Sequence, residues 1–189
     1  MSIIIEKQQF DEERALYNLT NAKVMDCVFA GPADGESVLK EARDVGVENC
    51  QFSLRYPLWH VQGFKMEHSS MDELTRAAIW YACDGEIKDS VLGGIKAVRE
   101  CRNISISGSK IVSQEFGWKC RGLAVKNCSI TSEYLFWESR DLTIDGLTMH
   151  GKYSFQYIEN AVIRNSNLQT KDAFWHAKNV RVEDSVVAG

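Results

Sequence analysis

The chain has 189 residues, of which 44% are apolar and 25% charged, as is ordinary for one soluble domain with a substantial core. The formal net charge of -4, with no local basic cluster, argues against a nucleic-acid or anionic-membrane partner. No stretch resembles an export signal or approaches the roughly 20 apolar residues of a membrane span. We therefore expect a cytoplasmic protein with no nucleic-acid or membrane partner.

A repeat of 19 residues runs through the chain, and we expect a single domain over residues 1–189. Each repeat starts at a turn-forming anchor: Ser2, Asn21, Asp44, Gly63, Asp84, Asn103, Gly122, Asp141, Asn160 and Asn179. Two steps between anchors are longer than the rest, 23 residues from Asn21 to Asp44 and 21 from Gly63 to Asp84. These steps predict insertions near residues 31–36 and 69–75.

Apolar residues stand one and three positions after nearly every anchor, and mostly polar residues alternate with them. This period of two predicts a short strand with one buried face, and a turn follows five positions after the anchor. Another apolar column, eight positions after the anchor, begins with Phe10, Phe29 and Phe52. The pattern predicts an all-β fold: a single-stranded right-handed parallel β-helix, or solenoid, of about ten coils of ~19 residues, stacked about 4.8 Å apart. The hand is inferred from the coil length.

A third strand is predicted before each following anchor. Positions five and two before the anchor, such as Leu58 and Val61, are apolar or small and are expected in the core. Four positions before the anchor lies a column with all five tryptophans of the chain: Tyr17, Lys40, Trp59, Trp80, Arg99, Trp118, Trp137, Gln156 and Trp175. Three positions before it lies a polar column: Asn18, Glu41, His60, Tyr81, Glu100, Lys119, Glu138, Tyr157 and His176.

The sequence leaves open whether the tryptophan column is buried or exposed. Strict strand alternation would turn it inward, whereas Lys40, Arg99 and Gln156 argue for exposure, because burying an unpaired charge costs several kcal/mol. If the column is exposed, flat rings beside polar groups favour binding or modification of a poly- or oligosaccharide. The residues predicted to contact the saccharide are Tyr17, Lys40, Arg55, Trp59, Trp80, Arg99, Trp118, Trp137 and Trp175.

Two pairs in the polar column are candidates for acid–base catalysis because each lies one coil apart: Glu41 with His60, and Tyr81 with Glu100. An enzyme of this kind would be a carbohydrate-active lyase or glycoside hydrolase, although plain surface hydrogen bonding explains the same pairs. The alternatives are a non-enzymatic scaffold or self-associating interaction protein, and a remnant without activity. The six cysteines lack zinc-ligand spacing, so we expect buried free thiols, no metal and no cofactor.

The segments FDEERALYNL, DGESVLKEAR, FSLRYPLWH and RAAIWYA, with coils such as GLAVKNCSI, resemble a family of uncharacterised bacterial proteins known only as a domain of unknown function. The resemblance covers essentially the whole chain and implies a pectate-lyase-like β-helix, but no activity and no catalytic residues. The three-aspartate cluster of polygalacturonases and the acidic calcium cluster of pectate lyases are both missing from the sequence. Family members look longer at the C-terminus, so we expect a truncated form or an uncapped last coil through which the protein forms a homo-oligomer.

Overall fold

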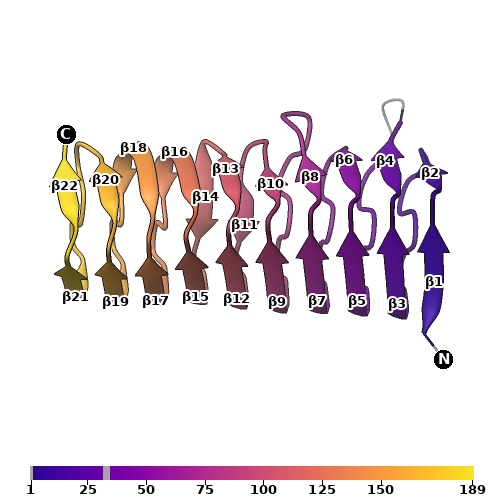
Figure 1. The fold of residues 1–189 in the computed structure, drawn as a ribbon, viewed down its shortest axis with the longest axis horizontal. Helices are drawn as coiled ribbons and strands as arrows, with labels where there is room; N and C mark the ends of the chain where they lie inside the picture. The colour runs from indigo at the N-terminus through magenta and orange to yellow at the C-terminus, as the bar shows by residue number, and fades with distance from the viewer. Residues whose placement is uncertain (1, 32–34) are drawn as a thin grey trace.

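A computed structural model describes residues 2–31 and 35–189 and shows a parallel β-helix (Figure 1). The described residues form 22 β-strands and no helix. Successive strands lie side by side along the long axis, and the two termini lie at opposite ends. The predicted parallel β-helix of about ten coils is confirmed. A right-handed turn is the one that parallel crossovers almost always take.

Each coil contributes one strand to a ten-stranded parallel sheet, here called the first sheet. Its strands are β1 (Ile3–Glu6), β3 (Thr20–Met25), β5 (Arg43–Glu48), β7 (Gln62–Glu67), β9 (Cys83–Lys88), β12 (Arg102–Ser107), β15 (Arg121–Lys126), β17 (Arg140–Asp145), β19 (Glu159–Arg164) and β21 (Lys178–Glu183). The register repeats every 19 residues, so that Ile104 pairs with Leu123 and Ile106 with Val125. Equivalent positions of the repeat therefore form columns along the axis.

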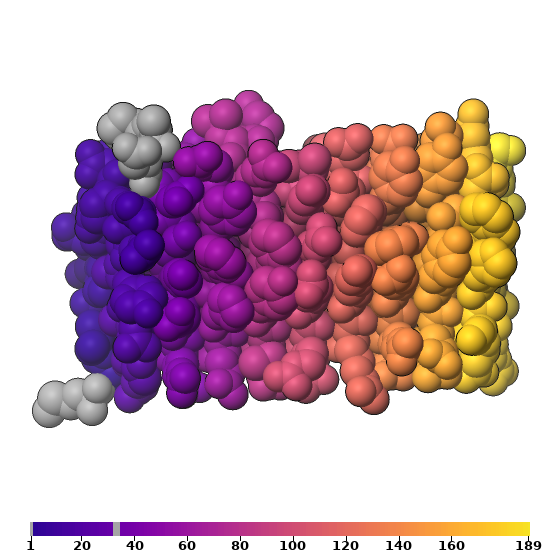
Figure 2. Space-filling model, turned by 180° about the vertical axis from the view of Figure 1, so that it is seen from behind, coloured from indigo at the N-terminus to yellow at the C-terminus, as the bar shows by residue number. Residues whose placement is uncertain are grey.

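A second sheet follows the first around each coil. Its main path contains β2 (Gln9–Phe10), β4 (Val28–Ala30), β6 (Gln51–Ser53), β8 (Ser70–Met71), β10 (Val91–Leu92), β13 (Lys110–Val112), β16 (Ser129–Leu135), β18 (Thr148–Ser154), β20 (Asn167–Gln169) and β22 (Val186–Ala188). Two further strands, β11 (Ala97–Arg99) and β14 (Glu115–Trp118), pair with each other, and β14 also pairs with β16. The colour bands of Figure 2 follow chain order from one end to the other, as expected when each coil packs on its neighbours.

The core consists of the apolar columns predicted from the repeat. Val24, Met66 and Ile87, three positions after their anchors, are fully buried. In the second sheet, the Phe29 ring stacks on Phe10 and on Phe52 with centroid distances of 5.1 and 4.9 Å. Burial of such side chains stabilises the fold by roughly 1.5–3 kcal/mol each relative to exposure.

Two glycines in the core leave space that a ring from the next or the preceding coil fills. A Cβ atom on Gly85 would lie closer than 3.0 Å to three carbon atoms of the Phe64 ring. A Cβ atom on Gly117 would meet the Phe136 ring in the same way. Large and small residues in neighbouring coils therefore compensate each other, and these two sites depart from the repeat.

A corner between the two sheets is held in most coils by a serine or cysteine six positions after the anchor. The Ser90 hydroxyl accepts a hydrogen bond from the Ser69 backbone N–H at 3.2 Å and donates one to the Lys88 carbonyl at 2.7 Å. Cys27, Cys50 and Cys128 occupy the same column, and their thiols donate to the equivalent carbonyls. All six cysteines are free, and five of them are buried as expected, whereas Cys83 is half-buried.

The insertions lie after strands of the second sheet. The loop after β8, formed by residues 72–75, rises above the rod (Figure 1). Thr75 closes this loop, because its hydroxyl donates to the Phe52 carbonyl at 3.2 Å. The other predicted insertion, residues 31–36, lies partly outside the described residues, which omit 32–34.

The third predicted strand is wrong for most coils. Only β11 and β14 extend into this segment, whereas β16 and β18 end one residue before it, and elsewhere the segment consists of turns and irregular backbone. The reason is a left-handed backbone at two positions of each coil, five and three before the anchor: Leu58 has φ 57° and His60 has φ 59°. Two left-handed residues only two positions apart depart from the extended β conformation, and in most coils this segment is therefore not a regular strand. We call this segment the third face.

Candidate functional site

The third face turns two side chains inward and two outward in each coil. In the coil that contains Pro57, Leu58 and Val61 are buried, whereas Trp59 is half-buried and His60 is exposed. The left-handed residues cause this pattern, because they break the strict alternation of a strand. Both apolar columns can therefore line the core while the tryptophan and polar columns share the surface.

Backbone hydrogen bonds of the third face run to both neighbouring coils. The N–H of Leu58 donates to the Val38 carbonyl of the preceding coil at 3.0 Å, and the N–H of His60 donates to the Trp80 carbonyl of the next coil at 2.9 Å. These bonds satisfy polar backbone groups that would otherwise be buried without partners. The surface columns thus stand on a rigid base.

The tryptophan ladder is the column from Tyr17 to Trp175, and it is partly exposed. Four of its tryptophans are half-buried, and Trp175 is 61% exposed. Gln156 is the most buried member of the ladder, with 7% exposure. The sequence left open whether the tryptophan column is buried or exposed, and the structure shows that it is partly exposed.

Cations stack between the rings of the ladder. Lys40 Nζ lies 4.6 Å from the Trp59 ring centroid. The Arg99 guanidinium lies between two rings, 5.2 Å from Trp80 and 5.5 Å from Trp118. Cation–π attraction of about 0.5–2 kcal/mol per contact explains why the column accepts charged residues. It also means that ring faces in the middle of the ladder are occupied by neighbours.

The indole N–H groups of the ladder differ in their partners. The Trp118 Nε1 donates to the Tyr134 carbonyl at 3.0 Å. The Nε1 atoms of Trp59 and Trp80 are buried and have no hydrogen-bond partner among the described residues. The rings of Trp59 and Trp80 stack on each other at 6.2 Å, so packing rather than hydrogen bonding fixes this part of the ladder.

A pocket of about 420 Å³ opens where Gln156 replaces a tryptophan. Its lining residues are Tyr153, Gln156, Lys171, Asp172, Ala173 and Trp175. The Gln156 amide donates from Nε2 to the Asp172 carbonyl at 3.1 Å, which holds the floor of the pocket in place. The Trp175 ring, which belongs to the last member of the ladder, is 61% exposed and lines this pocket beside Gln156.

Of the residues that line this pocket, the sequence had singled out only Trp175 as a contact residue. Tyr153 belongs to β18, and residues 171–173 lie in the irregular link between β20 and the third face. That link shows no repeating column. The usable signal was Gln156 itself, the single amide in a ladder of rings and cations.

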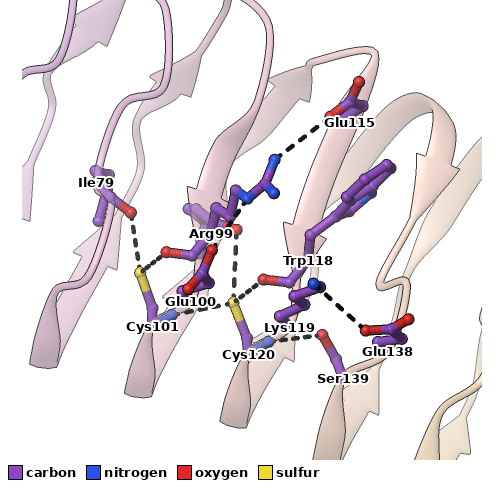
Figure 3. Close-up of polar contacts among 11 residues, drawn as sticks. Ile79, Arg99, Glu100, Cys101, Glu115, Trp118, Lys119, Cys120, Glu138 and Ser139 are labelled. Carbon is purple, nitrogen blue, oxygen red and sulfur yellow. Dashed lines mark hydrogen bonds and ion pairs between the residues drawn. The ribbon is translucent and has the colours of Figure 1, made fainter.

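The polar ladder, from Asn18 to His176, forms mainly local pairs (Figure 3). Figure 3 shows the Lys119 side chain pointing toward Glu138, with Nζ 3.7 Å from the carboxylate. Arg99 contacts Glu100 at 3.4 Å and Glu115 at 3.9 Å. Ion pairs as exposed as Lys119–Glu138 contribute at most about 1 kcal/mol.

In the two pairs predicted to be catalytic, Glu41–His60 and Tyr81–Glu100, Glu41 and His60 each contact a tyrosine. The Tyr17 hydroxyl donates to Glu41 at 2.8 Å, and this hydrogen bond raises the pKa of Tyr17. His60 lies one coil beyond and stacks on Tyr81 at 4.9 Å. Burial, followed by the nearby Glu100 carboxylate, raises the pKa of Tyr81, so this hydroxyl remains a donor at neutral pH. Glu41 is therefore engaged by a tyrosine.

The remaining predicted contact residue, Arg55, lies outside both ladders and forms an ion pair with Glu36 at 3.1 Å. Within residues 2–31 and 35–189, no group of three or more His, Cys, Asp or Glu side chains is arranged to hold a metal ion. In the same residues, no helix is long and apolar enough to span a membrane.

Among solved structures, the chain is similar to HetL, a pentapeptide repeat protein involved in heterocyst differentiation regulation from the cyanobacterium Nostoc sp. strain PCC 7120. The identity is 10%, the match covers 97% of this chain and 89% of that chain, and the TM-score is 0.41. The chain is also similar to QnrB1, a plasmid-mediated fluoroquinolone resistance protein, with 14% identity over 96% of this chain and 90% of that chain and a TM-score of 0.35.

No curated protein matches the sequence. The model of the family described as "Protein of unknown function (DUF3737)" matches residues 3–189. This match spans nearly all of the chain, and the protein therefore belongs to that family.

Proposed function

We propose that the protein binds a saccharide in the pocket beside Gln156. The observation that carries the proposal is an accessible Trp175 ring beside hydrogen-bonding side chains in one pocket of about 420 Å³. Sugar rings present C–H groups that pack on an aromatic face, and hydroxyls that need donors and acceptors at the rim. Tyr153, Lys171 and Asp172 supply both at this rim.

The proposal moves the binding site away from the middle of the tryptophan ladder. There the rings are covered by Lys40, Arg99 and one another, so a sugar could reach only their edges. At the Gln156 pocket a ring face is available. We therefore still propose a saccharide ligand, but its contact residues are those that line the Gln156 pocket rather than the whole tryptophan ladder.

We propose binding rather than bond cleavage. Glycoside hydrolysis generally uses two carboxyl groups that flank the scissile bond. Asp172 is the one carboxyl group that lines the pocket. A lyase of the pectate-lyase type would also need an acidic calcium cluster, for which the described residues hold no group.

The test is a titration of the protein with neutral and acidic oligosaccharides, followed by tryptophan fluorescence and calorimetry. Saccharide binding should perturb Trp175 emission, and Trp175→Ala should weaken binding at least about tenfold, equivalent to 1.4 kcal/mol. The matched control is Tyr81→Ala, which removes another exposed ring of the third face several coils away. Equal affinity of Trp175→Ala and the parent protein, or no saturable binding by any sugar, would reject the proposal.

A second candidate, self-association through the last coil, rests on exposed apolar residues of β21 and β22. Val182, Val186 and Val187 are exposed, whereas Val24 and Phe29, which stand at the positions of Val182 and Val187, are fully buried. The proposed occupant is a second copy, whose β1 and β2 would continue both sheets at the same spacing of about 4.8 Å. Sedimentation at increasing concentration tests this, and a monomer at all concentrations would exclude it.

A further inference from the structure

We infer a second binding site, for a small zwitterion of the α-amino-acid class, in a pocket formed by Glu41, Arg43, His60 and Gln62. This pocket has a volume of about 280 Å³ and lies between the polar ladder and the starts of β5 and β7. It is several coils away from Gln156 and shares no residue with the saccharide pocket. The inference is therefore independent of the proposed function.

The four side chains converge because of the register. Glu41 and Arg43 flank the inward Ala42, so both point to the surface of one coil. Gln62 is the registered partner of Arg43 in the next coil, and His60 stands in the polar ladder one coil after Glu41. Adjacent strands lie about 4.8 Å apart, a spacing that one small molecule can bridge.

The polar groups of this pocket are largely unused within the protein. No hydrogen bond or ion pair joins the side chains of Arg43, His60 or Gln62 to other described residues. Glu41 has one oxygen engaged by Tyr17 and a second oxygen free. His60 is fixed by stacking on Trp59 and Tyr81, which leaves its ring nitrogens available.

Two of the three other arginines of the same column, Arg121 and Arg140 but not Arg102, show the contrast. Arg121 pairs with Asp141 at 3.0 Å, and Arg140 pairs with Glu159 at 3.4 Å. Their guanidinium groups are already neutralised by carboxylates of the next coil. Gln62, at the position next to Arg43, offers no charge, so the Arg43 guanidinium remains free to take a carboxylate through two parallel hydrogen bonds.

The charge pattern identifies the ligand class. The Arg43 cation and the Glu41 anion both line the pocket, together with a neutral amide and an imidazole. A carboxylate on Arg43 and an ammonium group on Glu41 would satisfy both charges with one small molecule. A simple anion bound to Arg43 would be repelled by the Glu41 carboxylate. A simple cation bound to Glu41 would be repelled by the Arg43 guanidinium.

The experiment titrates the folded protein with L-alanine, acetate and methylammonium as separate probes, while NMR follows the His60 imidazole signals. L-Alanine should shift these signals saturably, and acetate and methylammonium should each bind at least about tenfold more weakly. Arg43→Gln should weaken L-alanine binding at least about tenfold. The control Arg121→Gln removes an arginine of the same column and should leave the affinity unchanged.

Unchanged binding in Arg43→Gln would overturn the inference, as would equal binding of acetate and L-alanine. A lack of any saturable shift with L-alanine would overturn it too. Because Arg43 is exposed, its replacement leaves the core intact, and an unchanged melting temperature verifies this.

Discussion

Replacing Gly85 by alanine should destabilise the protein through one neighbour, the Phe64 ring. The new Cβ atom would lie closer than 3.0 Å to three ring carbons, whereas carbon atoms in contact prefer about 3.5–4.0 Å. Phe64 is buried beside Val45, so the ring cannot move away without displacing the core. Overpacking of this kind costs about 1–3 kcal/mol of unfolding free energy.

A double-mutant cycle isolates this clash. Phe64→Val alone should cost roughly 2–4 kcal/mol, because it leaves a cavity. In the Phe64→Val background, Gly85→Ala should cost at least about 1 kcal/mol less than in the parent protein, since its Cβ atom then fills part of that cavity. Urea unfolding followed by tryptophan fluorescence measures all four free energies.

The matched control is Gly46→Ala in β5. The Cβ atom of this variant points outward and meets only Lys23 Cγ, at 3.8 Å. Its unfolding free energy should change by less than about 1 kcal/mol. Additivity of Phe64→Val and Gly85→Ala within about 0.5 kcal/mol would refute the reasoning, because the two substitutions would then act independently.

Three further predictions concern charge and pH. Arg99→Met should lower the unfolding free energy by about 1–3 kcal/mol, because the Trp80 and Trp118 rings and two carboxylates lose the cation that they contact. Lys40→Met should cost less, because Lys40 contacts the Trp59 ring. Thermal unfolding measures both. Burial raises the pKa of Cys50 to about 11. The stabilising contribution of the neutral Cys50 thiol is therefore fully present below the ordinary thiol pKa and is lost as pH rises through the raised pKa of the folded state. In urea unfolding, Cys50→Ser should lose less stability at alkaline pH than the parent protein does. Hydrogen bonds from Asn160, followed by Arg121, lower the pKa of Asp141. The stabilising contribution of the Asp141 carboxylate is therefore present above the ordinary carboxyl pKa and is lost as pH falls through the lowered pKa of the folded state. If Asp141→Asn lost the same stability at acid pH as the parent protein, this prediction would be contradicted.

The two sheets could be predicted from the sequence because their columns obey one spacing. Val24, Met66 and Ile87 share a position of the repeat, and each is fully buried. A period of two over a few residues is sufficient evidence for a strand when every coil repeats it. The spacing also predicted an insertion near residues 69–75, and the loop of residues 72–75 falls within that range.

The third face could not be predicted because its backbone is unusual for its residues. Ile79 has φ 56° and Val98 has φ 53°, a left-handed conformation that β-branched residues rarely adopt. Propensity therefore points to a strand at these positions. Within that column, Gly117, with φ 68°, is the one residue whose type agrees with the observed conformation.

The candidate sites were only partly foreseen, since residue columns do not reveal which groups are already engaged. Arg99 belongs to the predicted ladder, but its position between two rings depends on packing across three coils. Lys171 and Asp172 lie in a link without a repeat. Arg43 and Gln62 became notable only because they lack the partners that equivalent residues have.

The pairing of Phe64 with Gly85 has a consequence for how the chain finds its alignment during folding. Successive coils are so alike that a strand shifted by one whole repeat would meet nearly the same columns. A ring that fits only beside a missing side chain distinguishes the correct neighbour from the next one. Phe136 with Gly117 provides the same discrimination farther along. In a protein of nearly identical coils, the coils with an irregular residue pair determine the register of the stack.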